Sequence, residues 1–120
     1  MVSVVQVIIR PYPNPEYLPK GSEVWMWELH VAGTKIGAGA VQPDADGLPT
    51  VYGSHIAPPY RGQGWYSAAV LPALAHRFGA IWSGPCNAPS AGRAWQRTNA
   101  RYIGGRWCLQ GWRVISDSDY

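Results

Sequence analysis

The stretch Ile56-Ala-Pro-Pro-Tyr-Arg-Gly-Gln-Gly-Trp-Tyr66 carries the strongest structural signal in this chain. A strand-like run, Thr50–Ala57, leads into it, and a run without turn residues, Trp65–Phe78, follows it. Pro58 and Pro59 end the strand because neither has a backbone donor. The first amides of a helix have no internal partner, and the helix dipole adds positive potential where they point. A glycine-bearing turn between a strand and a helix therefore predicts a phosphate-binding site.

The full string, Ile56-x-Pro58-x-Tyr60-Arg61-Gly62-x-Gly64, resembles the acyl-CoA-binding signature of the GNAT superfamily of N-acyltransferases. The family's core loop pattern, Gln/Arg-x-x-Gly-x-Gly/Ala, corresponds to Arg61–Tyr66, and Tyr66 departs from the small residue usual at the last position. The resemblance covers Thr50–Tyr102 and extends only loosely into the first half of the chain. It implies a GNAT fold that uses acetyl-CoA or another acyl-CoA.

Composition favours one compact domain spanning residues 1–120. The net charge of +3 suits a polyanionic ligand such as CoA or nucleic acid. Cys86 and Cys108 are too few and too far apart for a zinc site, so no metal is expected. The N-terminus does not resemble a signal peptide, and no apolar stretch approaches the length of a membrane span. We therefore expect a cytoplasmic protein with no membrane partner.

Residue patterns along the chain predict strands that alternate with two helices. The expected strands are Val2–Arg10, Glu23–Val31, Lys35–Gln42, Thr50–Ala57 and Ala80–Ser83, followed by two short strands between Tyr102 and Ile115 separated by Gln110-Gly111. The expected helices are Gly64–Phe78, kinked or loosened at Pro72 and stopped by Gly79, and Ala91–Thr98, capped by Ser90.

This order indicates the α/β (α+β) class, with a mixed, mostly antiparallel sheet and two main helices, and it matches the GNAT order with one omission. The family places one or two helices after its first strand, where this chain has a proline-rich loop over residues 11–21. Those helices help to wall the acceptor site in the family. The resemblance therefore implies an open acceptor side, which favours a large or extended amine acceptor, such as a protein or a nucleic acid.

The resemblance also assigns the cofactor-binding residues. It implies that the backbone amides after Gly62, those of Gln63, Gly64, Trp65 and Tyr66, bind the pyrophosphate, with Arg61 nearby. It assigns the amide of Ile56 or Ala57 to the oxyanion and Asn87 to the pantetheine arm. The alternative for the whole stretch is an ordinary strand-to-helix turn with a solvated arginine.

Proton transfer is the least determined part of the chemistry. His55 lies beside the implied thioester position, and Glu28 and His30 share one face of the second strand, so all three are candidate bases. A structural or solvated role is the alternative for each of them. The family's usual acid, a tyrosine in the last helix, is replaced here by Trp95, whose indole is a donor but not an acid. Candidate substitutes are Ser90, Tyr66 and Tyr102; Trp95 itself suits a packing role.

Three functions fit these features. The first is an N-acyltransferase that moves an acetyl or related acyl group from acyl-CoA to a primary amine. The second is a GNAT-like module that binds CoA or another phosphorylated ligand without catalysis. The third is a small basic nucleic-acid-binding protein, whose aromatic residues stack bases while arginines meet phosphates: Arg61, Arg93, Arg97 and Arg101. The sequence leaves a homodimer open.

Overall fold

The computed structural model describes residues 4–14, 16, 18, 23–85 and 92–112. Its centre is a seven-stranded sheet in the order β1-β2-β3-β4-β5-β7-β6. All neighbouring strands are antiparallel except β4 and β5, which are parallel. The strands are β1 (Val5–Pro11), β2 (Trp25–Val31), β3 (Thr34–Pro43), β4 (Pro49–Ile56), β5 (Ala80–Ser83), β6 (Arg101–Ile103) and β7 (Arg106–Gln110). The predicted mixed, mostly antiparallel sheet is confirmed.

The hairpin of β2 and β3 follows directly from the sequence. Apolar and polar residues alternate along β2, and its apolar set faces the core, with Trp27 and Leu29 fully buried. Ala32 and Gly33 make the turn, and both have positive φ angles, 50° and 82°. Paired positive φ values are typical of the two-residue turn whose twist matches that of the flanking strands.

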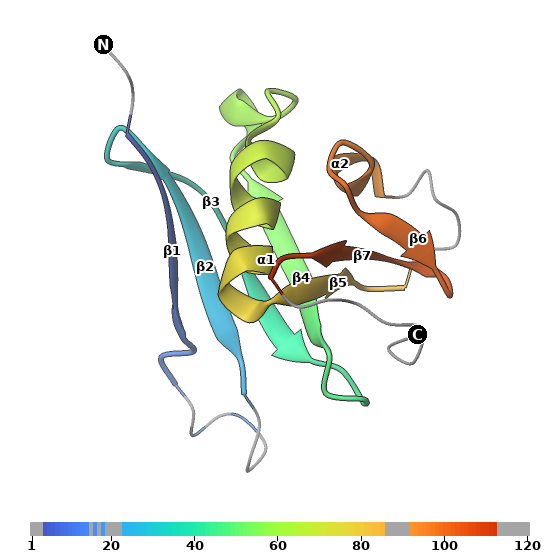
Figure 1. The fold of residues 1–120 in the computed structure, drawn as a ribbon. Coiled ribbons are helices and arrows are strands. Elements are labelled where there is room, and N and C mark those ends of the chain that lie inside the picture. The colour runs from blue at the N-terminus through green and yellow to red at the C-terminus, as the bar shows by residue number, and fades with distance from the viewer. Residues whose placement is uncertain (1–3, 15, 17, 19–22, 86–91, 113–120) are drawn as a thin grey trace.

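A single continuous helix crosses one face of the sheet (Figure 1). It opens with a π-helical turn, η3 (Tyr66–Val70), and continues as α1 (Leu71–Phe78). The amide of Leu71 bonds to the carbonyl of Tyr66, five residues back. Pro72 has no amide to continue the ladder, so the predicted loosening before it takes the form of this π turn. Gly79 ends the helix with a φ of 87°, also as predicted.

The main core lies between this helix and the sheet. Its fully buried members come from β2, β3, β5 and the helix: Trp27, Leu29, Ile36, Val41, Val70, Leu71, Leu74 and Ile81. On the opposite face of β2–β4, Thr50 is buried beside β5, and the other residues are partly or fully exposed: Met26, Glu28, His30, Ala38, Ala40, Tyr52 and His55. Within the described ranges, no helix is long and apolar enough to cross a membrane.

Two predictions near the C-terminus were wrong in detail. The last two described strands, β6 and β7, are joined by Gly104-Gly105, with φ angles of 62° and 82°, so the stretch expected as one strand before Gln110-Gly111 is two. Most of the strand expected after Gly111 lies outside the described residues. Gly111 instead lies against the carbonyl group of Ala75 in α1, where a Cβ atom would collide.

The second helix, α2 (Arg93–Gln96), is also shorter than predicted. Gly92 precedes it without a side-chain cap, and the predicted cap, Ser90, lies outside the described residues. Thr98 closes the helix, because its Oγ1 donates to the carbonyl of Trp95 and accepts from the amide of Ala100.

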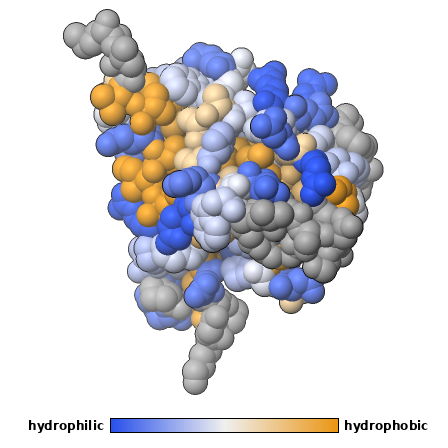
Figure 2. Space-filling view, in the orientation of Figure 1, coloured by the Kyte–Doolittle hydropathy of each residue, from blue (hydrophilic) through white to orange (hydrophobic). Residues whose placement is uncertain are grey.

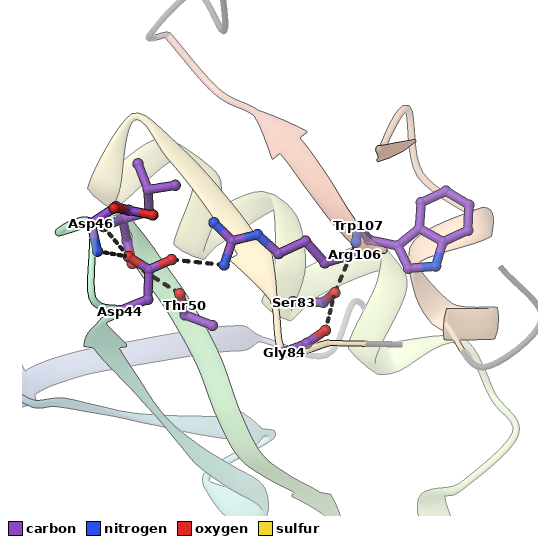
Figure 3. A network of polar contacts seen from close by, with 8 residues as sticks. Asp44, Asp46, Thr50, Ser83, Gly84, Arg106 and Trp107 are labelled. Carbon is purple, nitrogen blue, oxygen red and sulfur yellow. Dashed lines mark hydrogen bonds and ion pairs between the residues drawn. The ribbon is translucent and has the colours of Figure 1, made fainter. Parts of the chain in front are cut away.

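A polar network joins the β3–β4 turn to β7 (Figure 3). One carboxylate oxygen of Asp44 accepts the amides of Asp46 and Leu48, and the other lies 2.7 Å from Nη1 of Arg106. Burial raises the pKa of Asp44, but the Leu48 and Arg106 hydrogen bonds outweigh it and leave the pKa below its ordinary value. The network therefore connects two parts of the chain that are far apart in sequence.

Candidate functional site

The strands β4 and β5 separate beside the glycine turn, Arg61–Tyr66. They pair only at Thr50–Trp82 and Val51–Ser83, and β4 then continues to Ile56 without β5 as a neighbour. A bulge accompanies this separation, because three steps along β4, from Tyr52 to His55, match two steps along β3. Gly53 takes a φ of 62° within the bulge.

The bulge places His55 on the same face of the sheet as Tyr52, three residues before it. His55 pairs with Ala38, which lies between it and Glu28 in one row across the sheet, on the exposed face. Ser54 instead reaches the helix side, where its Oγ lies 2.8 Å from the hydroxyl of Tyr66. The side chain of Ile56 packs against the core on the helix side as well.

The backbone geometry distinguishes the two predicted oxyanion donors. The amide of Ala57 donates to the carbonyl of Ile36 at 2.7 Å, so it belongs to the sheet. Successive residues of a strand direct their backbone polar groups to opposite sides. The amide of Ile56 therefore points away from β3, toward the side from which β5 has separated.

The turn itself is held by its own side chains. Gly62 and Gly64 have φ angles of 76° and 84°, which an L-residue with a side chain adopts only at a cost. The side-chain amide of Gln63 donates to the carbonyl of Pro59 and accepts the indole N–H of Trp65. The first helical hydrogen bond runs from Ala68 to Gly64. The amides between those two residues thus precede the helical ladder and have no partner within it.

A cavity of about 230 Å³ lies beside this turn. It brings together predicted residues from β4, the turn and the helix start with two arginines at the two ends of α2, and none of the described residues that line it is acidic. The lining residues are Ile56, Tyr60, Arg61, Gly62, Gly64, Trp65, Tyr66, Ser67, Arg93, Ala94 and Arg97. From the sequence, Arg93 and Arg97 were expected to meet phosphates. Their position beside Arg61 could not be predicted, because it depends on how α2 packs against η3. Gln63 and Ala57 lie next to the cavity in sequence without lining it.

The exposed side chain of Arg61 folds back against the end of β4. Its Nε donates to the carbonyl of Ile56 at 2.7 Å, and its Nη2 lies 3.3 Å from Nδ1 of His55. Since an arginine only donates, Nδ1 of His55 is the acceptor in this contact. The cationic turn and the candidate base of β4 are therefore in direct contact.

The other two candidate bases bind each other. His30 Nε2 lies 3.0 Å from Oε1 of Glu28, and Lys35 Nζ lies 3.2 Å from Oε2. Arg10 approaches the same carboxylate at 3.7 Å. The hydrogen bonds from His30 and then Lys35 lower the pKa of Glu28, which weakens it as a base.

The candidate acids differ in their surroundings. Burial raises the pKa of Tyr66, and its hydrogen bond with Ser54 offsets this only in part. Tyr102 packs against its cross-strand partner Trp107 in the β6–β7 hairpin, with ring centroids 5.5 Å apart. Trp95, at the position of the family's acid, is buried in the core. Ser90 and the predicted pantetheine ligand Asn87 lie outside the described residues.

Two solved structures with this fold are acyltransferases. An IAA acetyltransferase from Bacillus cereus superposes with a TM-score of 0.53 at 14% identity, covering 88% of this chain and 99% of its own. A proposed acyl-CoA N-acyltransferase from Klebsiella pneumoniae gives 0.56 at 13% identity, covering 88% and 97%. No protein-family model and no curated protein matches the sequence. The chain therefore has a GNAT-like fold, and the likeness at this identity concerns the fold alone.

Proposed function

We propose that this protein is an acyl-CoA-dependent N-acyltransferase that transfers an acetyl or related acyl group to a primary amine. The observation that carries the proposal is the cavity at the end of β4, where a glycine turn, a helix start and three arginines converge and the described lining includes no carboxylate: Arg61, Arg93 and Arg97. Such a site suits a diphosphate. The acyltransferases among the solved structures with this fold support the same choice of ligand.

The turn and α2 would hold the phosphates. Backbone amides from Gly64 onward precede the first helical bond and offer donors at the positive end of the helix dipole. The positive φ of Gly64 keeps that backbone free of a side chain on the ligand side. Arg93 and Arg97 would add charge-assisted hydrogen bonds from α2.

The separated edge of β4 would hold the thioester. When the amine nitrogen attacks the acyl carbon, an electron pair moves onto the carbonyl oxygen; collapse then breaks the carbon–sulfur bond and releases the thiolate. The amide of Ile56 points to this side and would donate to the developing oxyanion. One donor aimed in this way contributes on the order of 3–4 kcal/mol. Ala57, whose amide is bonded to Ile36, is the weaker choice.

Proton transfer would depend on Arg61. Its contact occupies Nδ1 of His55, so that lone pair becomes available for the amine's proton only when the guanidinium turns toward the phosphates. Cofactor binding would thereby prepare the base. On the leaving-group side, a thiol with a pKa of about 8.5 leaves without help. The raised pKa of Tyr66 makes its phenol a weaker acid, and its hydroxyl is engaged by Ser54, so we assign it to orienting Ser54 rather than to acid catalysis.

The acceptor would approach across the exposed face of the sheet. His55 lies on that face, and the small side chains of Ala38 and Ala40 lie between β2 and β4 beside it. No helix of the described part of the chain packs on this face of β2–β4. An open approach favours an amine carried by a macromolecule, such as a protein or a nucleic acid.

Ligand binding gives the first test of this function. A ligand that binds only the folded state raises the melting temperature by mass action, so acetyl-CoA and CoA should both do so. The double variant Arg93→Ala/Arg97→Ala should lose most of the shift, and 3′,5′-ADP should retain part of it in the wild type. Unchanged melting in millimolar acetyl-CoA, CoA and longer acyl-CoAs would rule the cofactor out.

A transfer assay then separates an enzyme from a binding module. Release of free CoA thiol should accelerate with at least one member of a panel of lysine-containing peptides, proteins, nucleic acids and small amines. Stable binding of acetyl-CoA without thiol release across that panel would favour the binding module.

A further inference from the structure

The two edges of the sheet differ in how well they are protected. The edge strand β6 has three residues and follows closely after α2, whereas β1 has seven and, among the described strands, pairs only with β2. Long exposed edge strands are templates for pairing with another chain, and natural proteins shorten, charge or cover them. Of the residues in β1, only Arg10 is charged. Pro11 marks its end.

Two hydrogen bonds show which backbone groups of β1 face outward. Val4 accepts from the amide of Ala32, and the amide of Tyr12 donates to Val24, so even-numbered residues direct their polar groups toward β2. Odd-numbered residues direct theirs to the free side, since the direction alternates along a strand. The outward donors and acceptors therefore belong to Val5, Val7 and Ile9, and Pro11 can accept but not donate.

The side chains along this edge are apolar as well. Val4 and Val5 are 64% and 42% exposed, and they are two of the three large hydrophobic residues on the described surface that are exposed to this degree. Figure 2 shows apolar surface gathered along the side of β1, next to the N-terminal end. Val7 and Ile9 continue this surface on the helix side, where they are half-buried. Exposed apolar surface next to unpaired backbone favours a partner that is itself a strand.

We propose that β1 pairs antiparallel with the β1 strand of a second copy of this chain, with the two-fold axis passing through Val7. In this register Val7 faces Val7 of the second copy, and Val5 faces its Ile9. Every outward donor of β1 is then used, and Pro11 stays outside the bonded pairs. Registers shifted toward the C-terminus bring Pro11 opposite an outward residue and lose a hydrogen bond.

The side chains also suit a second copy better than an unrelated strand. On the helix face the register stacks β-branched residues against each other, a favourable cross-strand combination. On the other face it places Gln6 opposite Ile8 and Arg10 opposite Val4, so the two copies of Arg10 do not meet. The pairing continues one sheet through both copies. It does not depend on the proposed acyltransferase activity, because β1 is at the far edge of the sheet from β5.

Measuring the oligomeric state tests whether β1 pairs with β1 of a second copy. Sedimentation velocity over a concentration series should show a monomer–dimer equilibrium for the wild type. Val5→Lys should raise the dimer dissociation constant about tenfold or more, because it places a charge opposite an apolar residue. Gln42→Lys adds the same charge to an exposed residue of β3 and should leave the equilibrium unchanged. A wild type that stays monomeric throughout, or a Val5→Lys variant that dimerises as well as Gln42→Lys, would overturn the proposal.

Cysteine crosslinking tests the register. Paired residues at the two-fold axis have Cα atoms about 5.5 Å apart, within the range that a disulfide spans. Val7→Cys should therefore form a covalent dimer under mild oxidation. Ile9→Cys is the matched control, because the two copies of residue 9 would be displaced by four positions, about 13 Å. The wild type sets the background from the native cysteines. Equal crosslinking of the two variants would contradict the register, and crosslinking of neither would contradict the pairing.

Discussion

Arg61 lies across the end of β4 with its Nη2 3.3 Å from Nδ1 of His55, while its Nε donates to the carbonyl of Ile56. The residue that the proposed cofactor would attract is thus the same residue that restrains the proposed base. A planar guanidinium can make both contacts at once, and a lysine ammonium at the same position cannot reproduce that fork.

Arg61→Lys should therefore weaken acetyl-CoA binding about tenfold although the charge is kept. Isothermal titration with acetyl-CoA and with 3′,5′-ADP measures the effect, and Arg10→Lys on β1 is the control. Affinity equal to the wild type in Arg61→Lys would show that Arg61 contributes only its charge.

Gly64→Ala should reduce cofactor affinity by more than its cost to the fold explains. Gly64 has a φ of 84°, and Gly105, in the β6–β7 turn, has a φ of 82°; a Cβ atom at either position would meet nothing within 4 Å beyond its chain neighbours. Each alanine should therefore cost about 1 kcal/mol of unfolding free energy, from the backbone conformation alone. Only Gly64→Ala should also weaken acetyl-CoA binding, because only that turn faces the arginine cavity. Equal affinities in the two variants would place the cofactor elsewhere.

Trp95→Phe tests whether the position of the family's acid has any role in proton transfer here. Trp95 is 6% exposed and belongs to the main core, so the smaller ring should cost roughly 1–2 kcal/mol in urea unfolding. The dependence of the transfer rate on pH should keep its shape. A new or shifted limb in the pH profile would give Trp95 a part in the chemistry.

Much of this fold is local enough to be predicted from the sequence. The alternation in β2 and the helix that ends at Gly79 each depend on a few neighbouring residues. The turn between β6 and β7 was missed because Gly104-Gly105 and Gln110-Gly111 carry similar turn signals. What separates them is tertiary: β7 must present Cys108 and Leu109 to β5, and Gly111 is needed where the chain passes α1.

The sequence predicted where the candidate site lies along the chain, but not how its side chains are arranged in space. The string around Arg61 located the turn, the helix start and the end of β4. The bulge at Gly53 could not be anticipated, because it is defined by pairing with β3, and it is the bulge that places His55 on the same face as Tyr52, three residues away. The contact between Arg61 and His55 depends on the same geometry. Sequence patterns report the periodicity along one strand, whereas the bulge and the Arg61–His55 contact depend on the register between two paired strands.

Asp44→Asn should destabilise the fold by roughly 1–3 kcal/mol near neutral pH, because it removes the charged acceptor of Arg106 and weakens the turn. The folded pKa of Asp44 is below its ordinary value of 3.8. Its stabilisation is therefore fully present above about pH 4 and is lost as the pH falls through the folded pKa. Urea unfolding at a series of pH values should show the wild type and Asp44→Asn converging in acid. Asp46→Asn, two residues away and exposed, is the control and should follow the wild type throughout.

The last prediction concerns which side chain accepts the proton of the amine. His55→Ala should lower the transfer rate on the order of 100-fold near neutral pH, and by less at alkaline pH, where the free amine is already abundant. Glu28→Gln should change the rate little, because the carboxylate is already engaged by His30 and Lys35 and its pKa is lowered by them. His30→Ala should likewise affect stability more than rate, since its Nε2 is bound to Glu28. Arg61→Ala supplies a second arm: it removes the donor from Nδ1 in the free enzyme, so the pH profile of kcat/KM for acetyl-CoA should shift only if His55 is the base. A rate loss in Glu28→Gln as large as that in His55→Ala, with the same pH dependence, would transfer the role of base from β4 to β2.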